Sequence, residues 1–348
     1  MKNKRIFKLV GSICIAVVLA VMLLPVGCAP EDGDEEGPIT IGIFQILSHP
    51  ALDSAREGFK DAFKAALEAE NLTEGDVVFT ESNAAGSMDL CYTIADYFVA
   101  QGVDLICAIA TPSTIAAATA VNGTDIPVVF NSVTNPEDVG IENNDEPGGQ
   151  VTGVSDVAPV EPNLQLIIDI LGANNITFEK LGVMYNAGEP NSVYQVDVQL
   201  ADAIESLSLN ITVEEATVST GADVPSAAEA LVAADVDAIW IPTDNTVVAG
   251  IEGLVTVCEE YDVPVIASDV DTVVRGAIAS WGMQYYTVGY LSGEMAAEIL
   301  LEGTDPGTIP IGFVPANLLY VYPEEAVRQG VNITQSIIDQ ADEVIVDE

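Results

Sequence analysis

Basic residues are scarce in this chain. Its 348 amino acids include 10 Lys and Arg against 54 Asp and Glu, which gives a formal net charge of -44. Such a charge repels phosphate groups at long range, so the composition excludes nucleic-acid binding. The acids are scattered along the chain rather than grouped in blocks, which is typical of a solvated surface and says little about a ligand.

The sequence also lacks the residue patterns that most catalytic and metal sites need. It has one histidine, His49, which excludes His-based triads and multi-His metal centres. It has no Gly-rich phosphate loop and no Walker-type lysine motif. The spacing of the three cysteines beyond the N-terminal segment, Cys91, Cys107 and Cys258, matches no metal motif, and Cys107 lies inside an apolar run, as expected of a buried thiol. We therefore expect no enzyme activity, no metal and no cofactor.

The N-terminus has the order of a secretory signal. A basic start is followed by an uncharged apolar stretch from residue 9 to residue 24. A small residue precedes Cys28, as in a lipobox, where the cysteine becomes the lipid-carrying first residue; Pro25 departs from the leucine usual three places earlier. An uncleaved anchor is the alternative, because about 17 residues is the lower limit of a membrane span. Both alternatives predict an exported, tethered protein. With cleavage before Cys28, the signal peptide is 1–27 and the acidic tether is 28–38.

Strand and helix signals alternate along the rest of the chain. Expected strands are 39–46, 77–80, 105–110 and 128–131, and then 181–185, 212–218, 238–241 and 265–268. Expected helices are 50–70, 88–100, 113–121, 192–206, 226–233, 246–261 and 286–301. This alternation predicts an α/β fold whose parallel sheets are covered by helices on both faces.

Two pairs of similar segments indicate two related halves. Residues 104–112 (DLICAIATP) resemble 237–245 (DAIWIPTDN), and residues 126–134 (IPVVFNSVT) resemble 263–271 (VPVIASDVD). In open parallel sheets, ligands bind beyond the carboxyl ends of the strands. We therefore expect two Rossmann-like lobes with a ligand cleft between them. The expected segments are 39–157 plus 271–305 for lobe 1, and 158–270 plus 306–348 for lobe 2.

Polar residues at the expected strand ends are the candidate ligand contacts. They are Ser48, His49, Thr111, Pro112, Ser132, Thr134, Asp156, Tyr185, Asn186, Asn191, Ser192, Thr243, Asp244, Asn245 and Asp269. Ser, Thr, Asn and Asp also cap helices for purely structural reasons, and this alternative stays open for each of them. Their joint occurrence in both halves favours a ligand site.

The candidate residues suit a ligand with both a carboxylate and an amine. A helix that starts at Asn191 or Ser192 offers free N–H groups and a positive dipole end to a carboxylate. An amine requires an acid in the cleft, and Asp269, Asp244 and Asp156 all lie at strand ends. Tyr185 is a candidate for an aromatic wall, although buried aromatic residues more often belong to the core.

Residues 41–61, IGIFQILSHPALDSAREGFKD, resemble the first strand and helix of ABC-transporter substrate-binding lipoproteins of the TrpX type. Further matches follow in the family's order at 108–112, 127–136, 151–156, 182–186, 191–192, 241–245 and 267–269. The resemblance implies a type I periplasmic-binding-protein fold with three crossovers, closure on a small ligand, and delivery to an ABC permease in the membrane. By position, it places in the cleft Ser48, Thr111, Ser132, Thr134, Asn186, Ser192, Asn245 and Asp269.

Members of this family are linked to aromatic amino acids, so we expect a tethered, monomeric receptor for tryptophan, tyrosine or phenylalanine. Two departures from the family are Phe44, where a smaller residue is common, and the strong acidity. Another ligand, such as a nucleoside or a branched amino acid, is one alternative; a ligand sensor for a signalling partner is another. A DNA-binding repressor shares the fold, but the export signal and the acidic charge exclude it.

Overall fold

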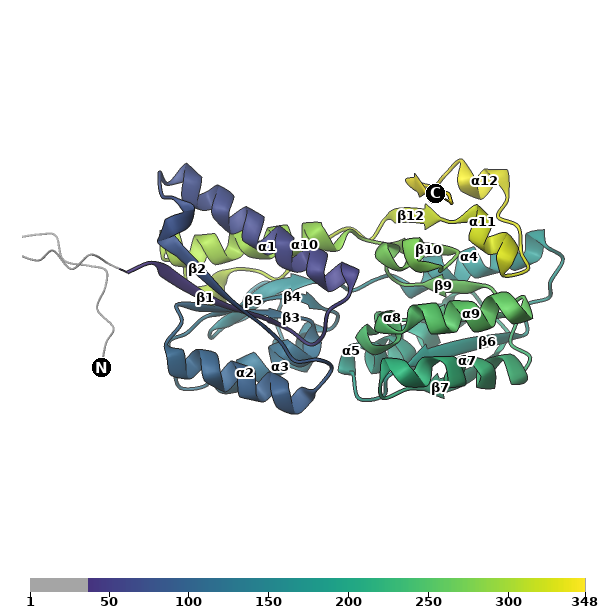
Figure 1. The fold of residues 1–348 in the computed structure, drawn as a ribbon, viewed down its shortest axis with the longest axis horizontal. Coiled ribbons are helices and arrows are strands. Elements are labelled where there is room, and N and C mark those ends of the chain that lie inside the picture. Colours follow the sequence, from purple (N-terminus) through teal and green to yellow (C-terminus); the bar gives the residue numbers. More distant parts are fainter. Residues whose placement is uncertain (1–36, 348) are drawn as a thin grey trace, which may run out of the picture. The chain divides into compact units, whose positions relative to one another are not determined.

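The computed structural model describes residues 37–347. The expected signal peptide, Cys28 and most of the acidic tether lie outside these residues. Within 37–347, the structure contains no helix that is both long and apolar enough to cross a membrane. Strands and helices alternate, as the sequence predicts, and the strands form two separate sheets (Figure 1).

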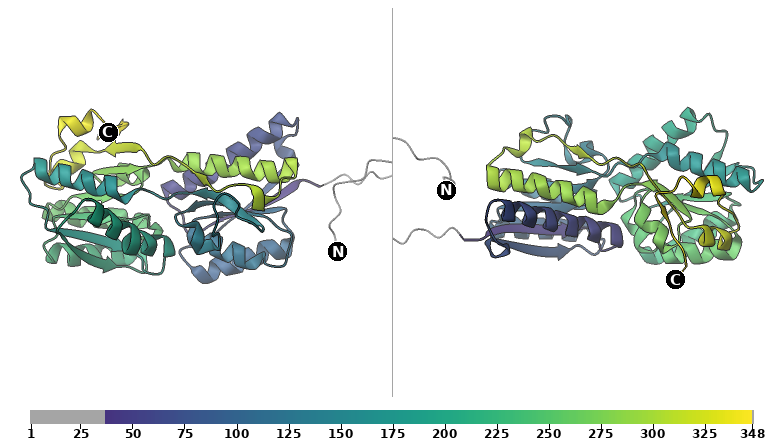
Figure 2. Two further views of the ribbon diagram at one scale, coloured as in Figure 1. Left: turned by 180° about the vertical axis from the view of Figure 1, so that it is seen from behind. Right: turned by 90° about the horizontal axis from the view of Figure 1, so that it is seen from above.

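The first sheet has six strands in the order β11-β5-β4-β3-β1-β2, all paired in parallel. Its strands are β1 (Ile39–Gln45), β2 (Val77–Asn83), β3 (Leu105–Ile109), β4 (Val128–Val133), β5 (Val151–Ser155) and β11 (Gly312–Phe313). Two helices cover each face (Figures 1 and 2). One face carries α1 (Pro50–Ala69) and α10 (Tyr285–Ala297), and the other carries α2 (Met88–Gln101) and α3 (Thr111–Ala120).

The second sheet has seven strands in the order β13-β12-β10-β9-β8-β6-β7, and β12 is antiparallel to β10. The strands are β6 (Lys180–Tyr185), β7 (Thr212–Thr217), β8 (Ala238–Ile241), β9 (Val265–Ala267), β10 (Ala279–Gly282), β12 (Leu318–Val321) and β13 (Glu343–Val344). The helices of this lobe are α4 (Val160–Ala173), α5 (Pro190–Tyr194), α6 (Ala201–Ser206), α7 (Val224–Ala233), α8 (Asn245–Ala249), α9 (Ile251–Tyr261), α11 (Pro323–Arg328) and α12 (Gln335–Ile338). A π-helical turn, Gln195–Leu200, joins α5 to α6.

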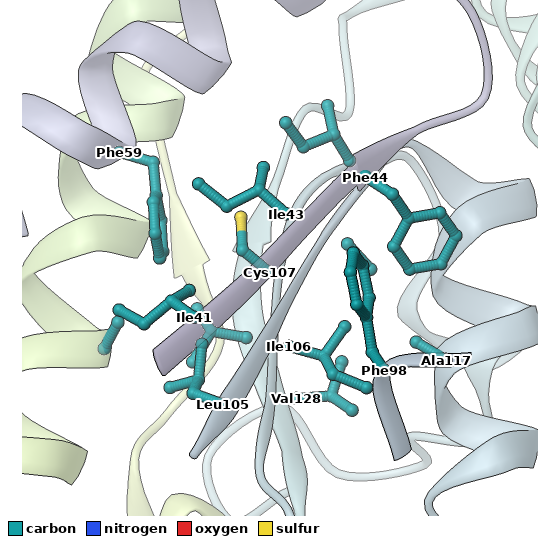
Figure 3. Packing of buried hydrophobic residues seen from close by; sticks show 14 of the residues in the cluster. Ile41, Ile43, Phe44, Phe59, Phe98, Leu105, Ile106, Cys107, Ala117 and Val128 are labelled. Carbon is teal, nitrogen blue, oxygen red and sulfur yellow. The ribbon is translucent and has the colours of Figure 1, made fainter. Parts of the chain in front are cut away.

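Apolar side chains fill both faces of the first sheet (Figure 3). Phe59 of α1 packs on one side of β1, and Phe98 of α2 packs on the other, where its ring lies 6.0 Å from that of Phe44. Because helices cover both faces, every residue of β3 is buried, including the free thiol of Cys107. Burial on both faces explains why the sequence of this strand is one continuous apolar run.

The chain passes between the lobes three times, after β5, between β10 and α10, and between β11 and β12. The last two crossings come later than expected. Residues 271–282 belong with the second sheet, because β10 pairs with β9 and β12, and residues 306–313 belong with the first, because β11 pairs with β5. The strands of both lobes have the same apolar character, so only their pairing assigns them to a lobe.

Asn163 of α4 holds two of the crossings together. Its buried side chain accepts a hydrogen bond from the backbone nitrogen of Trp281 and donates one to the Trp281 carbonyl oxygen, both at 2.9 Å. Trp281 lies in β10 and is half-buried, whereas Trp240 of β8 is fully buried in the core of the second lobe. The start of α4 is thereby tied to the strand that precedes the second crossing.

Helices α1 and α10 are in backbone contact. A Cβ atom on Gly289 would lie 1.8 Å from the carbonyl oxygen of Ala55, and one on Gly58 would lie 2.2 Å from that of Tyr286. Only glycine permits this approach. The contact fixes the relative position of the two helix starts, where His49 and Tyr285 are found.

Candidate functional site

The candidate residues lie where strands end and helices begin, in both lobes. Most of them are buried, and Thr111 and Ser192 are fully so. Two non-glycine residues at the ends of neighbouring strands have a left-handed backbone, with φ of 77° at Ala110 and 60° at Ser132. Backbone strain of this kind concentrates at ligand sites, where the surrounding structure holds it in place.

Several buried polar atoms at these strand ends have no hydrogen-bond partner within residues 37–347. They are Nδ1 of His49, Oγ1 of Thr111, Oδ1 of Asn191, Oγ1 of Thr243, Oγ of Ser268 and Oδ2 of Asp271. A buried polar group without a partner costs about 1–3 kcal/mol, so native proteins keep few of them. Both lobes contribute to this set, so these atoms are available to hydrogen-bond a ligand that reaches both lobes.

The start of α3 is open to an anion. In the described chain no side chain caps this helix, and its first residue, Thr111, has a fully buried hydroxyl without a partner. The N–H groups of a first helical turn have no partner within the helix, and the dipole favours negative charge there. A ligand carboxylate matches this environment.

The start of α5, where the sequence predicts a carboxylate site, has its side-chain donors already engaged. The side chain of Asn191 donates to the carbonyl oxygen of Thr243 at 2.6 Å, and the Ser192 hydroxyl donates to Asp244 at 2.6 Å. The buried carboxylate of Glu189 also lies 3.2 Å from the Asn191 amide nitrogen. A second carboxylate here would be repelled by Glu189, so the geometry favours α3 as the anion site.

Glu189 is a central residue of this region that no sequence pattern marks. Its carboxylate accepts hydrogen bonds from the backbone nitrogens of Asn245 and Thr246, at 3.1 and 3.0 Å, and from their side chains, at 2.6 and 2.7 Å. It therefore acts as an anion at the start of α8. In a chain with 54 acids, nothing in its sequence context sets this carboxylate apart.

Asp244 has a structural position. It caps α8, accepting from the backbone nitrogen of Val247 at 2.7 Å, and it also accepts from the Asn186 nitrogen and the Ser192 hydroxyl, both at 2.6 Å. Burial and the neighbouring Glu189 raise the pKa of Asp244 to about 7. These contacts are those of a helix cap, the structural alternative to a ligand contact for this residue.

Three acids gather near the crossings. Asp156 accepts hydrogen bonds from Thr134 and Tyr285, both at 2.9 Å, and burial raises its pKa to about 6. Burial and the charge of Asp269 raise the pKa of Asp271 to about 7. Within residues 37–347 none of the three forms an ion pair with Lys or Arg. This acidic cluster, Asp156, Asp269 and Asp271, suits a ligand cation.

The raised pKa values predict how the stability of the ligand-free protein depends on pH. A carboxyl whose pKa is higher in the folded state favours folding when protonated, so stability should rise as pH falls from 8 through 7 to 6. We expect Asp271→Asn to unfold at a higher temperature than wild type at pH 8 and to show a flatter profile. Thermal unfolding between pH 5 and 8 measures this. Asp235→Asn, an exposed acid, is the control for charge; equal slopes in all three proteins contradict the prediction.

His49 and Asn245 join the two lobes. His49 Nε2 lies 3.2 Å from Asn245 Oδ1, and both side chains are buried. A cavity of about 340 Å³ lies alongside, and residues of both lobes line it. Among them are Ser48 and Thr246, the sequence neighbours of the two bonded residues.

The remaining candidate residues have local contacts. The exposed Ser48 donates to Asp53 at 2.6 Å, and Ser132 donates to Asn131 at 3.2 Å. Asn186 donates to the Thr246 hydroxyl at 2.9 Å, and Pro112 is buried in the first turn of α3. Tyr185 belongs to the core of the second lobe, and its hydroxyl donates to Glu215 at 2.8 Å. Its contacts are thus those of a core aromatic residue.

Two α/β lobes with buried polar strand ends and three crossings between them define a cleft-type binding protein for small solutes. A family model for "ABC transporter substrate binding protein" matches residues 40–345. The curated tyrosine-binding protein of Clostridioides difficile (strain R20291) is 36% identical over 322 residues, covering 89% of this chain and 88% of that protein. The chain therefore belongs to the family of ABC transporter substrate-binding proteins.

Solved structures agree with this assignment. A conserved domain protein from Vibrio cholerae has a TM-score of 0.80 at 33% identity, covering 88% of this chain and 99% of its own. An ABC domain from Streptococcus pneumonia in complex with L-Trp has a TM-score of 0.79 at 28% identity. The match covers 89% of this chain and 100% of that domain. The ligand-free, open structure of a substrate-binding protein with adhesive properties from Clostridium difficile has a TM-score of 0.62 at 31% identity. This match covers 89% of this chain and 100% of that one. The chain thus superposes better on the L-Trp complex than on the open form.

Proposed function

We propose that this protein captures an aromatic α-amino acid and delivers it to the permease of an ABC importer. The observation that carries the proposal is the set of buried, unpartnered polar atoms at strand ends of both lobes. The names of two relatives support the ligand class: one is a tyrosine-binding protein, and another was solved with L-Trp. The type I periplasmic-binding-protein fold supports capture by lobe closure rather than turnover.

In the proposed complex the ligand backbone bridges the lobes. Its carboxylate binds at the start of α3, beside the Thr111 hydroxyl in the first lobe. Its ammonium group lies by the acidic cluster, in which Asp269 and Asp271 belong to the second lobe. A ligand that contacts both lobes favours the closed arrangement, because only that arrangement offers both sets of contacts.

The remaining parts of the proposal concern location and alternatives. Export and a lipid on Cys28 would hold a monomeric receptor at the outer face of the membrane, close to its permease.

A nucleoside has neither the carboxylate nor the ammonium group that this cleft suits. A branched amino acid has both and differs only in its side chain, and a ligand-sensor role would use the same cleft.

Calorimetric titration with matched ligands tests the proposal. We expect L-tyrosine or L-tryptophan to bind more tightly than L-leucine or adenosine. Tyramine lacks the carboxylate and 3-(4-hydroxyphenyl)propionate lacks the amine, so each should bind roughly 10–100-fold more weakly than L-tyrosine, as expected for losing a hydrogen bond to a charged group. Tighter binding of adenosine, or equal binding of tyramine and L-tyrosine, would contradict the proposal.

A further inference from the structure

We propose that His49 contacts the ligand and the opposite lobe at the same time. In this assignment Nε2–H donates across the cleft to Asn245, and Nδ1 accepts a hydrogen bond from the ligand's ammonium group. The inference rests on the proposed function for the identity of the ligand, but the state of the imidazole follows from the contacts of the protein alone.

The first step is the orientation of the Asn245 amide. Its Nδ2 lies 2.6 Å from a carboxylate oxygen of Glu189. Both Glu189 oxygens already accept from backbone N–H groups, so the carboxylate acts as an acceptor and must face the NH₂ group of Asn245. The amide oxygen of Asn245 is therefore the atom that faces His49.

The second step is the proton on the imidazole. An amide oxygen only accepts hydrogen bonds, so the Nε2 atom 3.2 Å away must be the donor. Burial lowers the pKa of His49, which favours the neutral ring. In a neutral ring with Nε2 protonated, Nδ1 has a free lone pair, and this atom is buried without a partner among residues 37–347.

The third step is the nature of the missing donor. The charges of Asp269 and Glu189 act on His49 more strongly than the opposing charge of Arg275, so the surroundings favour a cation and disfavour a carboxylate. An ammonium group has three N–H donors and can satisfy an imidazole nitrogen and a carboxylate together. The ammonium group of an amino acid then binds Nδ1 with one N–H and Asp269 with another.

This assignment gives His49 a positioning role as well as a binding role. A ligand on Nδ1 holds the ring in place, and the same ring orients the hydrogen bond to Asn245 in the opposite lobe. Glu189, Asn245 and His49 thus form one chain of hydrogen bonds that links the start of α8 to the ligand. Recognition of the amine and closure of the cleft become parts of a single event.

Nitrogen NMR tests the inference directly, because the chain has one histidine. With ¹⁵N-histidine labelling and a purification tag that contains no histidine, both ring signals belong to His49. We expect the ligand-free protein to show a neutral ring with the proton on Nε2. Saturating L-tyrosine should then shift the Nδ1 signal in the direction of an accepted hydrogen bond, while 3-(4-hydroxyphenyl)propionate should not.

Two substitutions separate the two ring atoms. His49→Gln places an amide near Nε2 and keeps a donor for Asn245, whereas His49→Asn places an amide near Nδ1 and loses the contact between the lobes. We expect His49→Gln to weaken L-tyrosine binding roughly 10–100-fold, as for a lost hydrogen bond to a charged group, and to weaken 3-(4-hydroxyphenyl)propionate binding much less. We expect His49→Asn to weaken both ligands, because closure is impaired.

Failure of the His49 assignment can be distinguished from failure of the proposed function. If wild type binds neither L-tyrosine nor L-tryptophan, the proposed function fails, and the ligand-free spectrum alone still tests the imidazole assignment. A proton on Nδ1, or a doubly protonated ring at pH 7, would overturn the assignment. Binding of L-tyrosine that leaves the Nδ1 signal in place would overturn the ligand contact, as would an equal loss of both ligands in His49→Gln.

Discussion

Glu189→Ala is expected to lower the free energy of unfolding by about 3–5 kcal/mol, because a buried acceptor of several hydrogen bonds is removed. The backbone N–H groups of Asn245 and Thr246 and the side chains of both residues would lose their acceptor at once. In a domain of this size the loss corresponds to a fall in unfolding temperature of roughly 10 °C.

The same change should also weaken ligand binding, since the Asn245 amide is then free to rotate away from His49. Thermal and urea-induced unfolding measure the stability, and calorimetry with L-tyrosine measures the affinity. Glu229→Ala is the matched control: this exposed acid of α7 removes the same charge from the same lobe and should change stability little. Similar unfolding temperatures for the two variants would show that the Glu189 contacts contribute little.

Gly289→Ala should cost about 1–3 kcal/mol or more, because inserting a methyl group into a packed interface forces the surroundings to move. The new Cβ would lie 1.8 Å from the carbonyl oxygen of Ala55, and a backbone atom cannot rotate out of the way as a side chain can. Helices α1 and α10 would have to separate. His49 and Tyr285 stand at the starts of these helices, so the affinity for L-tyrosine should fall as well.

Gly172→Ala gives the contrasting result. Gly172 lies in α4, and a Cβ there would meet no described atom within 4 Å. Alanine restricts the unfolded chain and suits a helix better, so this variant should be more stable by about 0.4–1 kcal/mol. Urea-induced unfolding compares the two variants with wild type. A loss of stability in both, or in neither, would contradict the close-packing explanation.

The alternation of strands and helices could be predicted from the sequence because each element carries its own periodicity. The expected strand at 238–241 and helix at 50–70 match β8 and α1 closely. The expected helix at 246–261 is split at Gly250, where the chain packs against the Gly221 carbonyl oxygen and a Cβ would lie 2.6 Å away. That break comes from a tertiary contact, which no local pattern contains.

The later crossings could not be placed from the sequence for a related reason. The strand β10 could join either sheet on composition, and its pairing with β9 and β12 decides the matter. The C-terminal strands β12 and β13 extend the second sheet through one antiparallel and one parallel pairing. Such pairings depend on contacts between residues far apart in the chain.

For the site, the rule that ligands bind at the carboxyl ends of strands points to the region where unpartnered buried polar atoms gather, but it does not give the role of each side chain. Asp244 and Asn191 have the residue types of ligand contacts, yet their hydrogen bonds hold the loops of the second lobe together. Glu189 has no distinctive sequence context, yet its carboxylate accepts hydrogen bonds from the backbone and the side chains of both Asn245 and Thr246. The direction of a hydrogen bond depends on neighbours that only the folded chain brings together.

The two tryptophans of the chain differ in a way that gives the protein an internal optical probe. Trp240 is fully buried in the second lobe. Trp281 lies just before the second crossing, where the side chain of Asn163 forms hydrogen bonds with its backbone. Light absorbed by indole but not by phenol excites these two residues alone when the added ligand is tyrosine. A change in emission would then originate at the crossing, so the movement of the lobes can be followed in real time without any attached dye.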